Sequence, residues 1–178
     1  MMLIENLDLN IIDKLDIDPD EGITLDGESV MFQLPPLKVL FGISERNKHY
    51  SLALSLFNYP HNVEHFECKR FFNLLESKMF SDTNHSNVLR ESKNWAPYFN
   101  LKLPNFLNGE FITKIYYKNP DVHLSSPLEC IKKGDIIIPV IECSGFWQSE
   151  KTKGANWDII QIQLTSKPNS GIYKWLYE

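Results

Sequence analysis

The stretch "GFWQSEKTKGANWDIIQIQL", residues 145–164, decides the expected fold. A polar Lys-Thr-Lys-Gly turn separates two runs rich in aromatic and β-branched residues, and such runs predict strands. Side chains alternate between the two faces of a strand. In the second run, the expected core face holds Ile160, Ile162 and Leu164, and the opposite face holds Trp157, Ile159, Gln161 and Gln163. An indole and two amides suit a contact surface better than an interior, so we expect the second face to bind a ligand.

Further short strands are expected on both sides of this stretch. Residues 110–119 and 134–147 are rich in the same residue types. Within the latter, Pro139 predicts an edge strand or a bulge, because proline cannot donate to a sheet ladder. For the same reason, residues 28–44 predict two extended pieces that are broken at Pro35-Pro36.

The run "YSLALSLFN", residues 50–58, alternates between large apolar and small side chains. Its expected core face holds Tyr50, Leu52, Leu54 and Leu56, and its second face holds Ser51, Ala53 and Ser55. This pattern predicts a half-buried strand. Because the second face is small and polar, a ligand could approach the strand backbone closely.

One helix is expected, over residues 63–79, where apolar residues recur at helical intervals and Asn62 supplies a start signal. Residues 81–87 predict a polar loop, and the proline-punctuated residues 94–109 predict irregular structure. A parallel sheet needs helices between most of its strands. The pattern therefore predicts a mainly β protein with one main helix, built as a small antiparallel barrel.

The charge of the chain is divided unequally along its length. The chain has 178 residues, which suits a single domain, and its formal net charge is −5. Residues 1–45 hold ten acidic and two basic residues, a charge of −8, and residues 46–178 hold thirteen acidic and sixteen basic residues, a charge of +3. We therefore expect an acidic leader over residues 1–28, loop-like or loosely docked, followed by one domain over residues 29–178.

The composition predicts an intracellular soluble protein. No apolar run approaches the roughly 20 residues of a membrane-spanning helix, and the acidic start lacks the basic region of a signal peptide. The three cysteines, Cys68, Cys130 and Cys143, show neither a CxxC pair nor metal-ligand spacing. Their odd number argues against a disulfide framework, so we expect reduced, structural thiols.

Rings and cations lie close together in the last third of the sequence, and residues 94–98 add two further rings. Unpaired bases offer faces that can stack and phosphates that need neutralising, so this combination suits single-stranded nucleic acid. The candidate contact residues are Lys114, Tyr116, Lys118, Lys132, Lys133, Lys151, Lys153, Trp157, Trp95 and Tyr98. The alternative is that the rings pack in the core and the lysines are only solvated.

A rival chemistry is suggested by "HNVEH", residues 61–65, which matches the H-x-x-E-H pattern of inverted zinc proteases. His61 and His65 would share the metal, and Glu64 would act as general base. The pattern falls at the very start of the expected helix, and a polar first turn explains it equally well. The chain has no Gly-rich phosphate loop and no G-x-S-x-G elbow. We therefore expect a protein that is not an enzyme and that uses no metal or cofactor.

Three quoted stretches carry a resemblance to a known family: "FQLPPLKVLFGIS" (32–44), "YSLALSLF" (50–57) and "LECIKKGDIIIPVIECSGFWQ" (128–148) with the following "GANWDIIQIQL" (154–164). In this order they resemble the single-stranded DNA-binding proteins of nucleocytoplasmic large DNA viruses. Those proteins are similar in architecture to phage-type replication proteins with an oligonucleotide-binding (OB) barrel. The resemblance covers about residues 31–164.

The resemblance implies an OB-like antiparallel β-barrel with an inserted helix, which binds single strands without catalysis. Lys133 and Gly134 match the turn before a barrel strand, and Trp147 matches the tryptophan that ends it. The closing strand is matched by Gly154, Trp157 and Gln161. The resemblance also implies work in viral DNA replication, recombination or repair, in the host cytoplasm or nucleus. The acidic leader would be available to recruit replication proteins, and a homo-oligomer is compatible with this function.

We therefore expect a sequence-tolerant single-stranded DNA-binding protein. The alternative is an OB-type protein-interaction or RNA-binding module without catalysis, because a fold does not fix a function.

Overall fold

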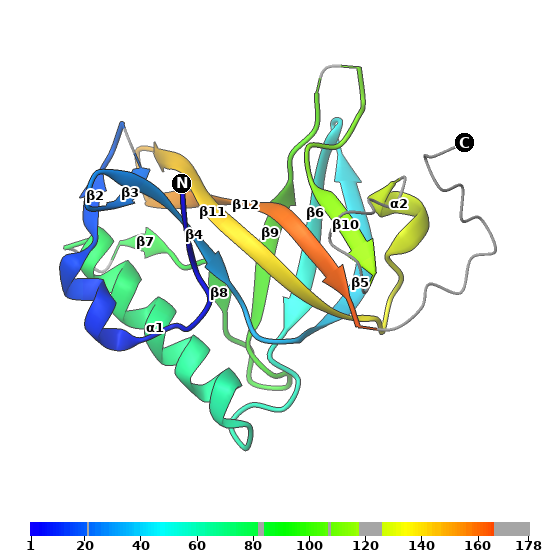
Figure 1. Ribbon diagram of the computed structural model, residues 1–178, viewed down its shortest axis with the longest axis horizontal. Coiled ribbons are helices and arrows are strands. Elements are labelled where there is room, and N and C mark those ends of the chain that lie inside the picture. Colours follow the sequence, from blue (N-terminus) through cyan, green and yellow to red (C-terminus); the bar gives the residue numbers. More distant parts are fainter. Residues whose placement is uncertain (21, 82–83, 107, 118–125, 166–178) are drawn as a thin grey trace.

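The computed structural model describes residues 1–20, 22–81, 84–106, 108–117 and 126–165 (Figure 1). It confirms a mainly β protein with one main helix. The described strands are β1 (Met2–Ile4), β2 (Asp16–Asp18), β3 (Gly22–Leu25), β4 (Glu28–Gln33), β5 (Leu37–Arg46), β6 (His49–Ser55), β7 (His85–Ser86), β8 (Leu89–Arg90), β9 (Tyr98–Leu103), β10 (Lys114–Tyr117), β11 (Ile136–Gln148) and β12 (Lys153–Leu164). The described helices are η1 (Leu9–Lys14), α1 (Val63–Met79) and α2 (Pro127–Cys130). Within these residues, no helix is long and apolar enough to cross a membrane.

The strands β11 and β12 form the long hairpin that the opening stretch predicted, but the expected faces of β12 are partly wrong. The pairing shifts between Val140 and Ile141, so that Gln161 opposes Val140 and Ile159 opposes Ile141. Ile160 is therefore the extra residue of a bulge, which reverses the alternation before it. Trp157 and Ile159 consequently face the core together with Ile162 and Leu164.

Five strands are linked in a closed circuit of pairings. The strand β12 pairs in parallel with β9, while the pairs β9–β6, β6–β5, β5–β11 and β11–β12 are all antiparallel. As predicted, Pro35-Pro36 separates β4 from β5, and the two strands pair with different parts of β11. The Pro139 carbonyl accepts a hydrogen bond from Leu34 N (2.9 Å). The nitrogen of Pro139 therefore faces the break between β4 and β5, where no ladder hydrogen bond is needed, and β11 can hold this proline inside the sheet.

Helix α1 confirms the predicted helix at both ends and packs its aromatic side chains against the sheet. The side chain of Asn62 caps its first turn by accepting from His65 N (2.9 Å). Phe71 and Phe72 are fully buried, and Phe72 contacts the Trp157 ring edge-on at 5.5 Å between centroids. This aromatic group is part of the hydrophobic core that the helix shares with the circuit.

Residues 94–109 are not irregular throughout, which corrects the expectation. They contain β9, a central strand that pairs with β6 over its whole length. Phe99, Leu101 and Leu103 alternate as buried residues, and Pro97 and Pro104 lie just outside the strand. The prolines that suggested irregularity therefore mark the ends of the strand.

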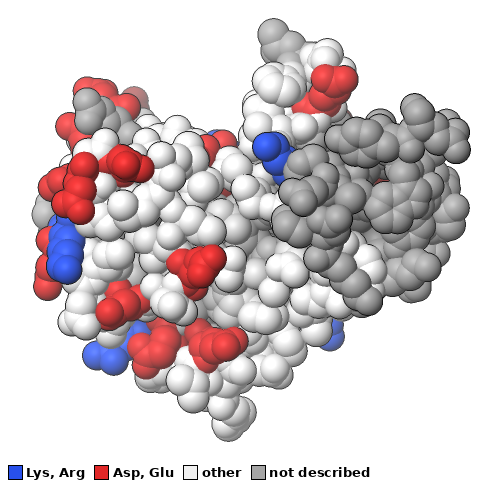
Figure 2. Space-filling model, in the orientation of Figure 1, with Lys and Arg blue, Asp and Glu red and all other residues white. Residues whose placement is uncertain are grey.

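The expected loop-like or loosely docked conformation of the leader is also corrected, because the described part of residues 1–28 belongs to the sheet and the core. The strand β1 pairs in parallel with β4, and β2 and β3 extend the same sheet. The buried side chains of this segment are Ile4, Ile12, Leu15, Ile23 and Leu25. The Lys78 ammonium of α1 donates to the carbonyls of Ile12 and Leu15 at 2.8 and 2.7 Å. The described acidic residues of this segment are exposed, and Figure 2 shows Asp and Glu gathered over the side of the molecule where η1 and β2 lie.

Candidate nucleic-acid interface

The outward face of β5, β6 and β9 is a small-residue strip between longer side chains. Register places Ser55 beside Tyr98, Ala53 beside Asn100, and Ser51 beside Lys102. Their neighbours Leu52 and Leu54 are fully buried on the inner face. The alternation predicted from "YSLALSLFN" is therefore confirmed: Ser51 and Ala53 are partly exposed between two hollows, and Ser55 is 3% exposed. We call this face the strip.

The first hollow lies at the end of the strip where the β5–β6 and β11–β12 hairpins approach each other. It has a volume of about 370 Å³ and is lined by Arg46, Arg90 and Lys102 among other residues, none of them Asp or Glu. The Lys102 ammonium donates to Asn156 Oδ1 at 2.7 Å, which aims it across the hollow toward β12. We call it the basic hollow, because three exposed cations converge there without a carboxylate in its lining.

One wall of the basic hollow is an indole ring that lies on a glycine. Trp147 ends β11 and pairs with Gly154 of β12. A Cβ atom at position 154 would lie 2.6 Å from Cζ2 of Trp147, so only glycine leaves room for the ring. Because Gly154 is buried beneath it and Trp147 is half-buried, one face of the indole packs on backbone while the side chain still lines the hollow.

The second hollow lies at the other end of the strip and is rich in rings. It has a volume of about 710 Å³, with Phe41, Phe57, Trp95 and Tyr98 among its lining residues. Lys38 and Lys133 also line it, and no Asp or Glu does. Phe41 and Trp95 are each 71% exposed. We call it the aromatic hollow.

A bulge in β5 presents Phe41 to this hollow. Val39 pairs with Leu54 and Ile43 pairs with Leu52, so three residues of β5 oppose Ala53 alone. Gly42 has a φ of +80°, a conformation that few other residues adopt without strain. The bulge turns Phe41 outward, beside the smallest side chain of the strip.

The two hollows share the strip and form one surface. Ser51 and Asn100 line the basic hollow, while Ser55 and Tyr98 line the aromatic hollow. Ser55 lies four residue steps along the strand from Ser51, about 13 Å at the usual rise of a β-strand. Exposed rings at one end and cations at both ends are the two kinds of side chain that single-strand binding surfaces combine.

The structure brings three of the predicted contact residues together and separates the others. Trp95, Tyr98 and Lys133 line the aromatic hollow, and Lys132 is exposed next to it. Lys114 and Tyr116 lie on β10, outside both hollows, and the Tyr116 hydroxyl is hydrogen-bonded to Gln161.

The remaining predicted residues that the structure describes are not part of the aromatic hollow. Lys151 and Lys153 belong to the β11–β12 turn region, where the Lys153 ammonium lies 5.8 Å from the centroid of the Phe80 ring. Trp157 is a lining residue of the basic hollow, but it belongs to the core and only 2% of it is exposed. Lys118 lies outside the described residues.

The sequence did not single out several lining residues of this surface. These are Lys38, Phe41, Arg46, Arg90 and Lys102. The small face of residues 51–55 was the one available signal for the location of the surface. Which cations border it depends on strand register, the β5 bulge and the closing of the circuit, and none of these can be read from local sequence.

The zinc hypothesis conflicts with the environment of His65. This ring is 2% exposed, its Nδ1 accepts from Asn58 N (3.2 Å), and its Nε2 lies 2.8 Å from the Pro36 carbonyl. Nδ1 is therefore the unprotonated nitrogen and Nε2–H the donor. Both ring nitrogens are hydrogen-bonded to backbone atoms, and His65 could bind a metal only by breaking one of these hydrogen bonds.

Comparison with solved structures shows the same fold in a phage protein. The single-stranded DNA-binding protein from bacteriophage Enc34 aligns with a TM-score of 0.56 and 10% identity, over 90% of this chain and 94% of that chain. The structure of the phage protein in complex with ssDNA aligns with a TM-score of 0.54 and 9% identity, over 88% of this chain and 97% of that chain. No family model matches the sequence, and no curated protein matches it. At these identities, the likeness establishes a shared fold.

Proposed function

We propose that this protein is a sequence-tolerant single-stranded DNA-binding protein with an OB-type barrel, which acts by binding and not by catalysis. The observation that carries the proposal is the continuous surface of the strip and its two hollows. Five Lys and Arg side chains and several rings line it, and no carboxylate does.

The position of this surface supports the proposal. The circuit β5–β6–β9–β12–β11 has the five strands of an OB barrel, in which β6 and β9 are the second and third. OB barrels bind oligonucleotides on the face of these two strands and on the loops between strands one and two and between strands four and five. Here those loops are the β5–β6 and β11–β12 hairpins, which border the basic hollow. The fold shared with a phage single-stranded DNA-binding protein adds to this support.

We place the function in viral DNA replication, recombination or repair, and we place the chain with the single-strand binders of nucleocytoplasmic large DNA viruses. Replication proteins are the partners that this setting offers, and a homo-oligomer is compatible with it. These assignments rest on the motif order over residues 31–164.

The proposal is tested by fluorescence polarisation with labelled dT20 and with a 20-base-pair duplex across a salt series. We expect tighter binding to the single strand and affinity that falls as salt rises, because bound phosphates release counterions. The variant Arg46→Ala/Lys102→Ala should weaken dT20 binding and reduce the slope of log K against log salt by about 1.4, at about 0.7 per contact.

The comparison variant is Lys114→Ala/Lys151→Ala, which removes two predicted cations that lie outside both hollows. We expect it to change the slope less. Equal affinity for duplex and single strand would overturn the proposal, and a preference for structured RNA would support the alternative of an RNA-binding module.

A further inference from the structure

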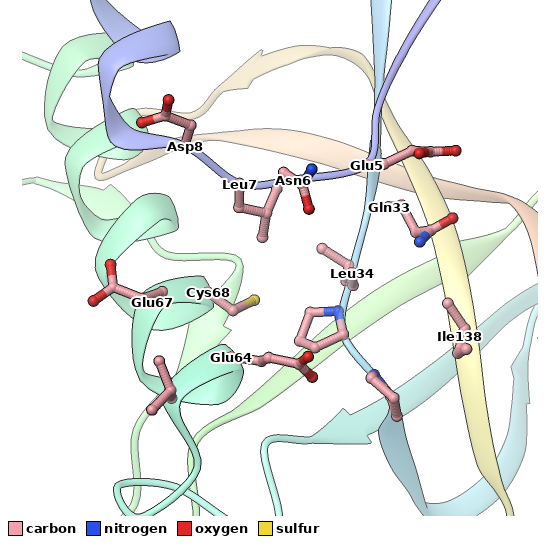
Figure 3. Close-up of a pocket in the computed structure, with 13 residues that line it drawn as sticks. Glu5, Asn6, Leu7, Asp8, Gln33, Leu34, Glu64, Glu67, Cys68 and Ile138 are labelled. Carbon is pink, nitrogen blue, oxygen red and sulfur yellow. The ribbon is translucent and has the colours of Figure 1, made fainter.

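A third hollow lies on a different part of the molecule and has the opposite charge. Figure 3 shows it between the chain that leaves β1, the chain that leaves β4 and the first turns of α1. Its volume is about 440 Å³. It shares no lining residue with the strip or its two hollows. We call it the acidic groove.

The floor of the acidic groove is apolar. It is lined by Leu7, Leu34, Cys68 and Ile138 and by the two rings of Pro35-Pro36. Leu34 and Cys68 are buried, whereas Val63, at the start of α1, is 75% exposed at the groove. The exposed valine and the apolar floor together form a hydrophobic surface on which one or two aliphatic side chains of a ligand could pack.

The rim of the groove carries only negative charge. Glu5 and Asp8 stand on the chain between β1 and η1, and Glu64 and Glu67 stand on α1, while the lining includes no Lys, Arg or His. Glu67 reaches only its own helix neighbour Arg70, at 4.0 Å. Among the described residues, neither Glu5 nor Glu64 has an ion-pair partner.

We propose that the acidic groove docks a basic peptide segment of a partner protein, with an aliphatic side chain on the apolar floor and flanking Lys or Arg side chains against the four carboxylates. Charge complementarity selects this occupant. A nucleic acid would bring phosphates to the carboxylates, and an uncharged apolar segment would leave Glu5 and Glu64 without an ion-pair partner.

The inference goes beyond the proposed function, since it assigns a second ligand to a separate surface. The strip and the acidic groove have no residue in common, so a single strand and a peptide can occupy them together. The acidic leader contributes Glu5, Leu7 and Asp8 to one wall of the acidic groove. The fold therefore fixes the positions of the two acidic residues, Glu5 and Asp8, at this groove.

The test uses the full chain and a fluorescein-labelled peptide, Gly-Lys-Arg-Leu-Ile-Lys-Arg-Gly. We expect saturable binding by polarisation, lost when Leu-Ile is replaced by Ser-Ser, because the floor selects an apolar side chain. Glu64→Lys/Glu67→Lys should weaken binding at least tenfold. The matched control Asp16→Lys/Asp20→Lys makes the same charge change on the leader outside the groove and should stay within twofold.

A second measurement does not depend on variants. In methyl NMR spectra of the unmodified protein, the peptide should shift the methyl signals of Leu7, Leu34, Val63 and Ile138. Shifts confined to other methyl groups, equal binding of the Ser-Ser peptide, or equal weakening by both double variants would each overturn the inference.

Competition with dT20 separates this inference from the proposed function. We expect the peptide to stay bound when dT20 is added at a salt concentration at which dT20 does not bind the peptide alone, and displacement under that condition would mean a shared site and overturn the inference. Failure of dT20 to bind, with the peptide still seated in the groove, would count against the proposed function alone.

Discussion

Phe41 shows how a single residue can mark a functional surface. A phenylalanine that is 71% exposed contributes little to the core, and here a bulge and a glycine with positive φ hold it outward. The same bulge places it opposite Ala53, the smallest side chain on that face of β6. This arrangement fits a platform for a base, because a flat ring with one free face can stack without reading sequence.

We predict that Phe41→Ala weakens dT20 binding while leaving the fold intact. Stacking on an aromatic side chain is worth about 1–3 kcal/mol per base, which corresponds to roughly 5- to 150-fold in affinity. Because the side chain is largely exposed, the free energy of unfolding in urea should change by less than about 0.5 kcal/mol. The matched control is Phe106→Ala, which removes another exposed ring, 55% exposed, outside both hollows. Equal effects of the two variants on affinity would contradict the prediction.

Trp147 and Trp157 show what residue patterns can and cannot predict. Both lie in residues 145–164, where Trp147 precedes the polar turn and Trp157 follows it. Alternation from Leu164 places Trp157 on the outer face, but the bulge at Ile160 moves it into the core. Trp147 lines the basic hollow because Gly154 on the neighbouring strand leaves space for its ring. Each outcome depends on the pairing partner, which lies outside the local pattern.

At the scale of elements, the sequence predicted strongly periodic segments well and short ones poorly. Helix α1 and the break between β4 and β5 follow from periodicity and proline chemistry, and both are confirmed. The strand β9 was missed because its flanking prolines outweighed the alternation of Phe99, Leu101 and Leu103. Only part of the proposed contact surface is among the residues predicted from the sequence, since its cations come from β5, β8, β9 and a turn that sequence does not place together.

Helix α1 also holds the segment that carries Arg90, through a buried carboxylate. Glu76 is 3% exposed and accepts a hydrogen bond from Val88 N at 2.6 Å. Burial raises the pKa of this carboxyl from 4.5 to about 7, against the lowering effect of the Val88 hydrogen bond and of nearby His85 and Arg90. The folded state therefore favours the protonated acid more than the unfolded state does.

From this pKa we predict that Glu76→Gln stabilises the protein progressively as pH rises. Because the folded pKa is the higher one, the wild-type protein loses stability between about pH 4.5 and pH 7, and the loss is constant above that range. A difference of this size corresponds to roughly 3 kcal/mol at pH 8 relative to pH 4, at about 1.4 kcal/mol per pKa unit. Urea unfolding of both proteins across this range provides the measurement. Glu67→Gln, on the same helix, is the control, and parallel stability profiles for Glu76→Gln and wild type would contradict the prediction.

At the scale of the whole molecule, the division of charge along the sequence becomes a division between surfaces. Residues 1–45 carry most of the acidic excess, and the exposed acids of η1 and β2 gather on one side (Figure 2). The cations of the strip come from residues 38–133. The cations of the strip therefore attract the phosphates of an approaching single strand, and the acids on the other side repel them. The distance over which this repulsion acts depends on the salt concentration.

The leader is best tested by neutralisation, because deletion of residues 1–28 would remove β1 and five buried apolar side chains and should unfold the protein. We predict that Asp13→Asn/Asp16→Asn/Asp20→Asn tightens dT20 binding at 10 mM salt and changes it less than twofold at 0.15 M. The Debye length falls from about 30 Å to about 8 Å between these conditions, which confines the effect of distant charges. Lys14→Gln, on the same part of the chain, should have the opposite sign at low salt. Equal tightening at both salt concentrations would instead mean that these acids compete directly with DNA at the strip, whereas no change at either would mean that their field does not reach it.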